Sequence, residues 1–449
     1  MFWEKEGKLI YSYDGETVCI EAWGKDALRV RATKNRSFTG RDWALEAKDA
    51  HAGEVEIFED PSAKGGAFAN MYEGTDTSYG KITNGKLHAV IDSGSVITFY
   101  HEDGRVLLKE HFRRLRDEES MPLNIMGREY SNGVGDNFRI VARFVARKGE
   151  KIFGMGQYQQ HELDLKGCML ELAQRNSQVS VPFYLSSIGY GFLWNNPGVG
   201  QVMFANNGTE WVTESGKEID YLVIAGDTPA EIEENYMTLT GKPPMMPEYG
   251  MGFWQCKLRY WNQEQLLSVA RKYKELGVPL DVIVVDFFHW TKQGEFKFDP
   301  KYWPDVPGMC RELKEMGIQV VVSVWPTVDI YSENFEEMKE KGYLVRTEHG
   351  VPLTMLCGGN EVFFDATNPD ARTYVWEKIK KNYYDQGAKL FWLDVAEPEY
   401  SVYDFKNYRY QLGSVQEVGN IYPKYYLKAF YDGMTAEGDT MPISLIRSA

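Results

Sequence analysis

Asp286, Trp325 and Asp394 each come directly after a short apolar run in the second half of the chain. If these runs are parallel strands, their carboxyl ends meet at one edge of a sheet, where side chains face a common substrate. Paired carboxylates are what glycoside hydrolysis needs, one to attack the anomeric carbon and one to move the proton. A lone aspartate after a strand is more often a turn former, but two carboxylates and a tryptophan at three strand ends are harder to explain in that way.

Asp394 is the better candidate for the nucleophile. It lies in the run Trp392-Leu393-Asp394-Val395-Ala396-Glu397, between apolar residues and a second carboxylate. We expect Glu397 to support Asp394, either by holding it in position or by acting on it as a like charge. Arg447 ends the last apolar run, and its forked donors suit Asp394 or a sugar hydroxyl, although a salt bridge to a helix is equally compatible with the sequence. Asp286 is suited to accept two hydrogen bonds from a vicinal diol.

The composition excludes several classes of function. A net charge of −15 argues against nucleic acid as a partner, because phosphates would be repelled. The five cysteines are scattered without a CxxC pair, which favours reduced thiols over a disulfide framework or a zinc site: Cys19, Cys168, Cys256, Cys310 and Cys357. The sequence has no His/Cys cluster, no P-loop and no complete dinucleotide fingerprint, so we expect neither a metal nor a cofactor.

The sequence also gives expectations about location and assembly. Charged residues interrupt the first fifteen positions, where a signal peptide needs an apolar run. No apolar stretch approaches the roughly 20 residues that span a bilayer. We therefore expect a cytoplasmic protein without a membrane partner, and the sequence leaves open whether it forms a homo-oligomer.

Residues 1–226 are patterned as strands throughout. Short runs alternate between apolar and polar residues, for example Phe138–Phe144, and Gly, Asn and Asp separate the runs. Asn84-Gly85 between two such runs is a strong hairpin signal. Many short alternating strands predict an N-terminal β-sandwich domain over 1–226.

The pattern changes at residues 227–247. Thr228 to Glu231 forms a capping box with proline at the first helical position, and Gly241 ends the predicted helix. Three prolines follow, at 243, 244 and 247. This segment is predicted to be a linker helix and a stiff connector between two domains.

From residue 248 to 449, predicted strands and helices alternate. Strands are expected over 249–255, 280–285, 320–324, 389–393 and 443–446. Repeated βα units with buried parallel strands suit a (β/α)₈ barrel or an open doubly wound sheet. A closed barrel needs eight strands in about 250 residues, so we expect an incomplete barrel that stops after about five strands. The doubly wound alternative lacks a Gly-rich phosphate loop to support it.

Several motifs in this order along the chain resemble those of glycoside hydrolase family 31. The most specific is Trp392–Glu397, which is similar to the family's WxDxxE nucleophile motif. The other matching segments are Phe153–Gln157, Val181–Gly191, Thr240–Pro244, Trp303–Asp305, Phe364–Pro369 and Asn420–Pro423. The resemblance covers nearly the whole chain.

The resemblance implies a retaining mechanism with Asp394 as nucleophile, and it places Asp286 and Trp325 in the sugar-binding subsite. Arg447-Ser448-Ala449 resembles the start of the family's arginine motif, which a catalytic acid/base aspartate follows after a short stretch. On this basis the chain as given is expected to lack the acid/base. General acid help is typically worth roughly 10²–10⁴ in rate, so an unactivated glycoside would be turned over slowly.

The resemblance also implies an oligosaccharide or α-glycoside as substrate. Segments 252–256, 286–290 and 323–326 look more like the α-xylosidase branch of the family. Phe287, Phe288 or Trp290 would fill the space of a glucose hydroxymethyl group, which favours xylose. Trp392 is a further expected substrate contact. The alternatives are an α-glucosidase or α-transglucosylase of the same family, or a catalytically impaired carbohydrate-binding fragment.

Overall fold

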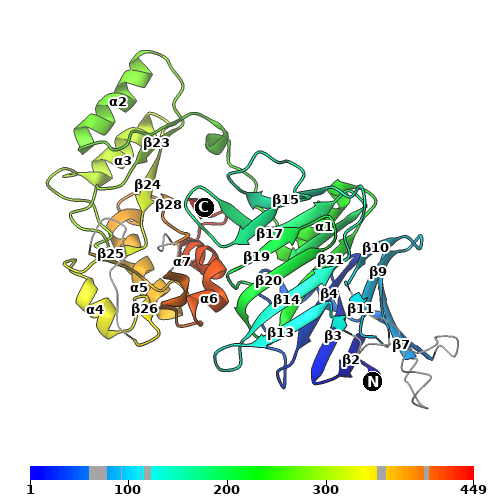
Figure 1. The fold of residues 1–449 in the computed structure, drawn as a ribbon. Coiled ribbons are helices and arrows are strands. Elements are labelled where there is room, and N and C mark those ends of the chain that lie inside the picture. Colours follow the sequence, from blue (N-terminus) through cyan, green and yellow to red (C-terminus); the bar gives the residue numbers. More distant parts are fainter. Residues whose placement is uncertain are drawn as a thin grey trace. The chain divides into compact units, whose positions relative to one another are not determined.

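The computed structural model describes residues 1–59, 78–92, 94–111, 113–115, 123–350, 360–398 and 404–448. The chain divides into two compact units, one formed by Met1–Ala173 and Ser180–Pro243 and the other by Gln174–Val179 and Pro244–Ala449. The first unit consists mainly of β-sheets, and the second combines strands with helices (Figure 1).

Three large sheets make up the described part of the first unit. The largest follows the order β1 (Phe2–Lys5), β2 (Lys8–Tyr13), β3 (Glu16–Trp23), β4 (Ala27–Thr33), β21 (Ile219–Ala225), β18 (Tyr190–Trp194), β17 (Val179–Ser186), β15 (Ile152–Gln157), with β5 (Ala50–His51) on β3. The second runs β10 (Val106–Lys109), β9 (Ile97–His101), β8 (Leu87–Ile91), β7 (Ser78–Asn84), β6 (Glu54–Glu59). The third runs β13 (Arg128–Asn132), β14 (Phe138–Phe144), β20 (Thr209–Gly216), β19 (Gly200–Phe204), β16 (Met169–Leu172). A short ribbon pairs β11 (Arg113–Leu115) with β12 (Leu123–Ile125).

The three sheets share one hydrophobic core. Ile20 of β3, Ile82 of β7 and Phe144 of β14 all belong to it, although they come from different sheets. In β14 the alternation predicted from the sequence is present: Ile140, Ala142 and Phe144 enter the core, while Arg143 on the other face donates to Glu210 at 2.6 Å. The expectation of a sheet-rich N-terminal domain is confirmed.

Helix α1 (Pro229–Thr240) packs onto the first unit. Its N-cap, Thr228, accepts a hydrogen bond from the backbone N–H of Glu231 at 3.2 Å, as the capping box predicts. Ile232 and Leu239 join a second core cluster that includes Leu193 of β18 and Leu222 of β21. The helix therefore covers this sheet through its apolar face, and the assignment of 227–247 as a linker stays a prediction.

The second unit is built on a parallel sheet in the order β22 (Trp254–Gln255), β23 (Val282–Val285), β24 (Gln319–Val324), β28 (Leu390–Leu393), β30 (Ser444–Ile446). This spatial order follows the chain order without reversal. A doubly wound sheet reverses its strand order at a switch point, whereas a barrel winds in one direction. The arrangement therefore argues against the doubly wound alternative.

Helices and short ribbons connect these strands. The helices are α2 (Gln263–Glu275), α3 (Val306–Glu315), α4 (Phe335–Glu340), α5 (Pro369–Ile379), α6 (Val415–Val418) and α7 (Tyr422–Ala436). Two antiparallel ribbons pair β25 (Thr327–Asp329) with β27 (Glu361–Phe363), and β26 (Arg346–Thr347) with β29 (Tyr408–Arg409). Asn262, Asp305 and Asn368 cap α2, α3 and α5 through their side chains.

The first predicted strand of this unit is much shorter than expected. A strand was predicted over 249–255, but Glu248–Met251 forms a 3₁₀ turn and β22 contains Trp254–Gln255 alone. Gly250 donates to the Pro247 carbonyl at 2.9 Å, and Gly252 donates to the Tyr249 carbonyl at 3.2 Å. These local i→i+3 bonds compete with extension along the sheet.

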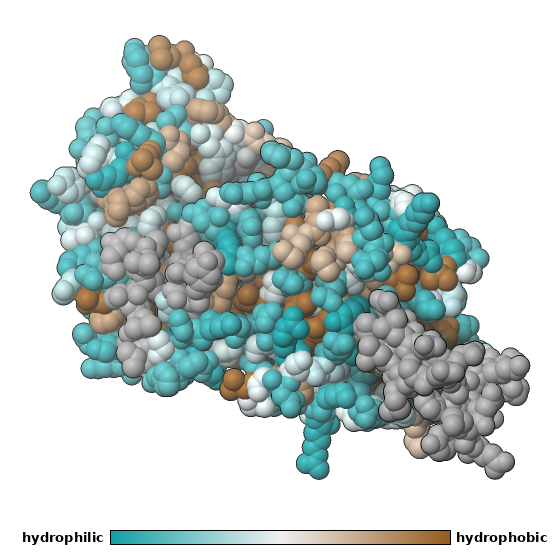
Figure 2. All heavy atoms as spheres, viewed as in Figure 1, coloured by the Kyte–Doolittle hydropathy of each residue, from teal (hydrophilic) through white to brown (hydrophobic). Residues whose placement is uncertain are grey.

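The face of the molecule in Figure 2 carries mostly hydrophilic side chains, with hydrophobic ones in small groups between them. Charged residues make up 26% of the chain, which fits this hydrophilic surface. None of the helices in the described ranges is long and apolar enough to cross a membrane.

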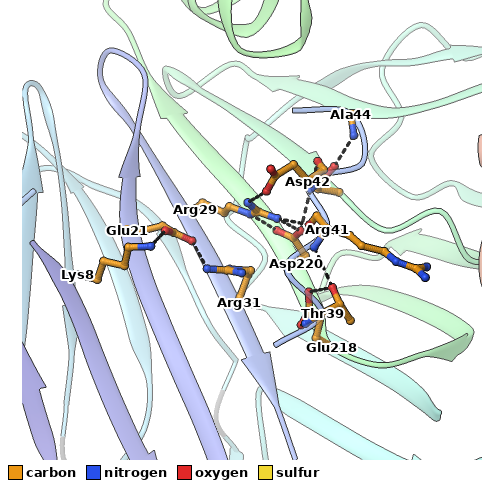
Figure 3. A network of polar contacts seen from close by, with 11 residues as sticks. Lys8, Glu21, Arg29, Arg31, Thr39, Arg41, Asp42, Ala44, Glu218 and Asp220 are labelled. Carbon is orange, nitrogen blue, oxygen red and sulfur yellow. Dashed lines mark hydrogen bonds and ion pairs between the residues drawn. The ribbon is translucent and has the colours of Figure 1, made fainter. Parts of the chain in front are cut away.

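A buried guanidinium joins the strands of the largest sheet (Figure 3). Arg29 of β4 is fully buried, and it donates to both carboxylate oxygens of Asp220 on β21, at 2.9 and 2.7 Å. Its third contact is Asp42 at 2.7 Å, and Asn195 donates to Asp220 at 2.8 Å. Burial opposes the charged form, but the carboxylates outweigh it and raise the pKa of Arg29.

We expect Asp220→Asn to destabilise the first unit by about 3 kcal/mol, because the buried guanidinium would lose its main counter-charge. The shift in the urea midpoint of unfolding measures this effect. Asp14→Asn is the matched control, since the Asp14 side chain is 83% exposed and lies 3.6 Å from the ammonium group of a partly exposed lysine. Equal midpoints for the two variants would contradict a structural role for the pair.

Candidate active site

Strand register brings the predicted residues to one edge of the parallel sheet. Val324 of β24 pairs with Leu393 of β28, and Leu393 pairs with Ile446 of β30. The next residue on each strand is Trp325, Asp394 and Arg447, so these three are neighbours at the carboxyl edge. Asp286 follows β23 at the same edge, one strand further on.

Alternation also places these side chains on one face of the sheet. Val282, Val284 and Val321 form a cluster on this face, and the Trp392 ring packs against it. Asp286 follows Val284 by two residues, and Asp394 follows Trp392 by two residues. Because side chains alternate along a strand, each aspartate points to the same face as the residue two positions before it. The catalytic candidates thus stand above a floor of branched apolar side chains, and Trp392 is part of that floor.

Asp394 is held by Arg447. The Arg447 Nε donates to Asp394 Oδ1, and Asp394 is only 7% exposed. Two backbone bonds fix the pair: Arg447 N–H to the Leu393 carbonyl at 2.9 Å, and Ala396 N–H to the Arg447 carbonyl at 3.1 Å. The residue after Asp394 is Val395, whose φ of 56° is unusual for a β-branched side chain. Strain of this kind persists where the surroundings impose it.

Glu397 shares the same arginine. Its carboxylate is buried, and Glu397 Oε1 lies 3.6 Å from Arg447 Nε. The guanidinium therefore lies against two carboxylates and offsets their mutual repulsion. Arg447 therefore connects Glu397 to Asp394.

The negative charge of Asp394 affects the pKa of Asp286. Burial raises the pKa of Asp286, and the negative charge of Asp394 raises it further. One carboxylate oxygen accepts the Phe287 N–H at 2.8 Å, and the other lies 3.6 Å from the Cys256 sulfur. The thiol is a donor here, because burial and the Asp286 charge raise the pKa of Cys256 to about 11.

Aromatic rings stand beside the carboxylates. Phe287 stacks on Trp325 with centroids 5.4 Å apart and planes 20° apart. Trp290 meets Trp325 edge-on, with centroids 5.9 Å apart. Within the described residues the Trp325 indole N–H is buried without a hydrogen-bond partner. A stacked aromatic surface next to carboxylates is suited to a sugar, whose apolar face stacks and whose hydroxyls bond.

His289 has a structural role that the sequence did not reveal. It is buried, and it contacts the Asp286 carbonyl at 2.9 Å and the Tyr383 hydroxyl at 2.9 Å. Burial lowers its pKa to about 4, so the ring is neutral near pH 7. It anchors the loop that carries Asp286 and Phe287. The Cys256 contact was missed for the same reason, because both depend on loop conformation.

Helix α7 holds the end of β24 through a hydrogen bond. Tyr426 donates its hydroxyl proton to the Val324 carbonyl at 2.9 Å, and the Asp394 N–H reaches the same carbonyl at 3.0 Å. In the described ranges there is no group of three or more His, Cys, Asp or Glu side chains that could hold a metal ion. The arrangement offers a fixed carboxylate, a second carboxylate with a raised pKa, and an aromatic wall.

We compared the chain with known proteins. Residues 243–449 match the glycosyl hydrolases family 31 TIM-barrel domain. The chain is 45% identical over 455 aligned positions to the uncharacterized family 31 glucosidase ORF2 of Pseudescherichia vulneris, and it covers 83% of that protein. The chain belongs to glycoside hydrolase family 31. The resemblance inferred from the motifs is confirmed.

Two further members of the family are close in sequence or structure. An α-xylosidase of family 31 from a soil metagenome, solved in complex with xylose, is 49% identical with a TM-score of 0.91 over 100% of this chain and 66% of that chain. α-Xylosidase A of Aspergillus niger is 30% identical over 95% of this chain and 60% of its own length. The chain thus spans about two thirds of these α-xylosidases.

The coupling of the two aspartates makes a testable prediction. Asp394→Asn removes a nearby negative charge, so the pKa of Asp286 should fall toward the ordinary value for aspartate. NMR titration of ¹³C-labelled aspartate carboxyls measures this shift, with Asp286→Asn to assign the signal. Asp370→Asn, at the exposed start of α5, is the control and should leave the signal unchanged. An Asp286 titration that is the same in wild type and Asp394→Asn would show that the carboxylates are not neighbours.

Proposed function

We propose that this protein is a retaining α-glycoside hydrolase that releases a terminal α-linked sugar, xylose in preference to glucose. The observation that carries the proposal is the fixed position of Asp394. Arg447 holds its carboxylate at the edge of the sheet, on the same face as Asp286. A nucleophile held in this way needs little rearrangement before attack.

In this mechanism, Asp394 attacks the anomeric carbon from the β face. The bond to the leaving group breaks, and its electron pair leaves with the glycosidic oxygen, so a β-glycosyl ester forms on Asp394. Water then displaces the carboxylate from the opposite face and restores the α configuration. Asp286 accepts hydrogen bonds from the sugar hydroxyls, and Glu397 supports the nucleophile through Arg447.

The proton donor for the leaving group is a separate question. The family resemblance predicts an acid/base aspartate a short stretch after Arg447, beyond Ala449, and this stays a prediction. The incomplete barrel, the cytoplasmic location and a homo-oligomeric assembly also stay predictions. The tests below use leaving groups that need no proton donor, so they report on Asp394 itself.

The choice of xylose rests on the aromatic wall. Phe287 stacks on Trp325 beside Asp286, and Trp290 contacts the same indole. In our proposal these rings take the space of a hydroxymethyl group at C5. Two of the relatives above are named α-xylosidases, which supports the same choice.

An α-glucosidase is the second candidate. The relative from Pseudescherichia vulneris is named a glucosidase and is 45% identical to this chain. Transfer to a sugar acceptor instead of water would use the same nucleophile. A binding protein without turnover would use the same sugar-binding residues. Product analysis with an added sugar acceptor separates hydrolysis from transfer.

The sugar preference can be measured with glycosyl fluorides. Fluoride leaves without a proton donor, and azide attacks the glycosyl ester without a general base, so turnover is followed as fluoride release in the presence of azide. We expect α-xylosyl fluoride to react at least about tenfold faster than α-glucosyl fluoride. Phe287→Ala should reduce this ratio, because it opens space at C5.

Asp394→Ala is the control for this measurement, and it should abolish formation of the α-configured azide with both sugars. Faster reaction of the glucosyl fluoride in the wild type would overturn the choice of xylose. Formation of the α-azide by Asp394→Ala would overturn the assignment of the nucleophile.

A further inference from the structure

Arg259 holds an unusual position beside the candidate site. Its guanidinium carbon lies 3.7 Å from the ring centroid of Trp261 and 5.3 Å from that of Phe288. None of the residues that the structure describes gives this guanidinium a hydrogen bond or an ion pair. On the described residues its donors therefore have no partner, although the chain contains 65 acidic residues.

A series of ring contacts connects Arg259 to the candidate sugar site. Phe288 lies 4.5 Å from Phe287 between ring centroids, and Phe287 stacks on Trp325 at 5.4 Å. Arg259 and Trp261 follow β22 closely, and Cys256 in the same segment contacts Asp286. The series Trp325–Phe287–Phe288–Arg259–Trp261 thus leads away from the carboxylates.

The outer part of this series is exposed and held in place. Phe288 is 50% exposed and Trp261 is 59% exposed. Phe288 has a φ of 61°, a conformation that is uncommon for an aromatic residue. Its neighbour His289 fixes this turn through the Asp286 carbonyl and the Tyr383 hydroxyl, each at 2.9 Å. Exposed rings that the loop holds rigidly lose little entropy on binding a ligand.

We propose that Arg259, Trp261 and Phe288 bind the leaving-group side of the substrate and favour a leaving group that carries a carboxylate. This inference rests on the proposed function. A planar guanidinium stacked on an indole presents its remaining donors in a fixed fork, which matches the two oxygens of a carboxylate. With no counter-charge on the described residues, the guanidinium has its full charge available for the ligand.

Binding measurements test the proposal without relying on turnover. Two ligands are compared by calorimetry with the whole chain: the α-xyloside of 4-hydroxybenzoate, which carries a carboxylate, and the α-xyloside of 4-hydroxybenzamide, its neutral counterpart of nearly the same shape. We expect the carboxylate to bind about fivefold more tightly in wild type, as for an exposed but well-oriented ion pair. Arg259→Gln should remove this preference and leave the affinity for the amide nearly unchanged.

Arg271→Gln is the matched control, since Arg271 is an exposed arginine that is paired with Glu312 at 2.6 Å. It should keep the wild-type preference. Equal affinities for the two ligands in wild type, or an unchanged preference in Arg259→Gln, would overturn the proposal.

Asp286→Asn separates this outcome from failure of the proposed function. If Asp286 binds the xylose unit, this variant weakens both ligands together and keeps their ratio. If it binds both ligands as tightly as wild type, the sugar site itself is wrongly placed, and the proposal for Arg259 fails with it.

Discussion

The contact between Arg447 and Asp394 is the interaction on which the site depends. Asp286, Asp394 and Glu397 are all buried at one edge of the sheet, and burying like charges without a counter-charge is costly. One guanidinium donates to Asp394 and lies 3.6 Å from Glu397. Because the arginine follows the neighbouring strand, its position is set by the sheet and not by a flexible loop. The Asp394 carboxylate is thereby held at a defined position in a buried place.

The rest of the second unit keeps this edge in register. Parallel pairing aligns the ends of β24, β28 and β30, and Tyr426 of α7 fixes the last carbonyl of β24. On the adjacent strand, neutral His289 holds the loop after Asp286 to the interior. The valine cluster beneath gives the carboxylates a rigid floor. The positions of these side chains are thus set by strand register and loop anchoring.

Patterns that are local in sequence predicted much of this arrangement. Apolar runs of strand length before Asp286 and Asp394 placed both residues correctly at strand ends. These runs are recognisable because parallel strands that are buried on both faces consist almost entirely of apolar residues. The first strand was predicted wrongly because Gly250 and Gly252 form tight turns that the apolar pattern does not reveal. The contacts of Cys256 and His289 depend on the conformation of loops and on partners such as Tyr383, ninety-four positions away from His289. In the first unit, alternation predicted strands, but pairing such as β4 with β21 joins distant segments and could not be predicted.

Covalent trapping of the nucleophile tests the central claim most directly. A 5-fluoro-α-xylosyl fluoride has a leaving group that needs no proton donor and a second fluorine that slows breakdown of the ester. Incubation with the chain, followed by proteolysis and mass-spectrometric sequencing, locates the attached sugar. The account predicts a single xylosyl ester on Asp394 and no label in Asp394→Ala. A label on another side chain, or unchanged labelling in Asp394→Ala, would contradict it.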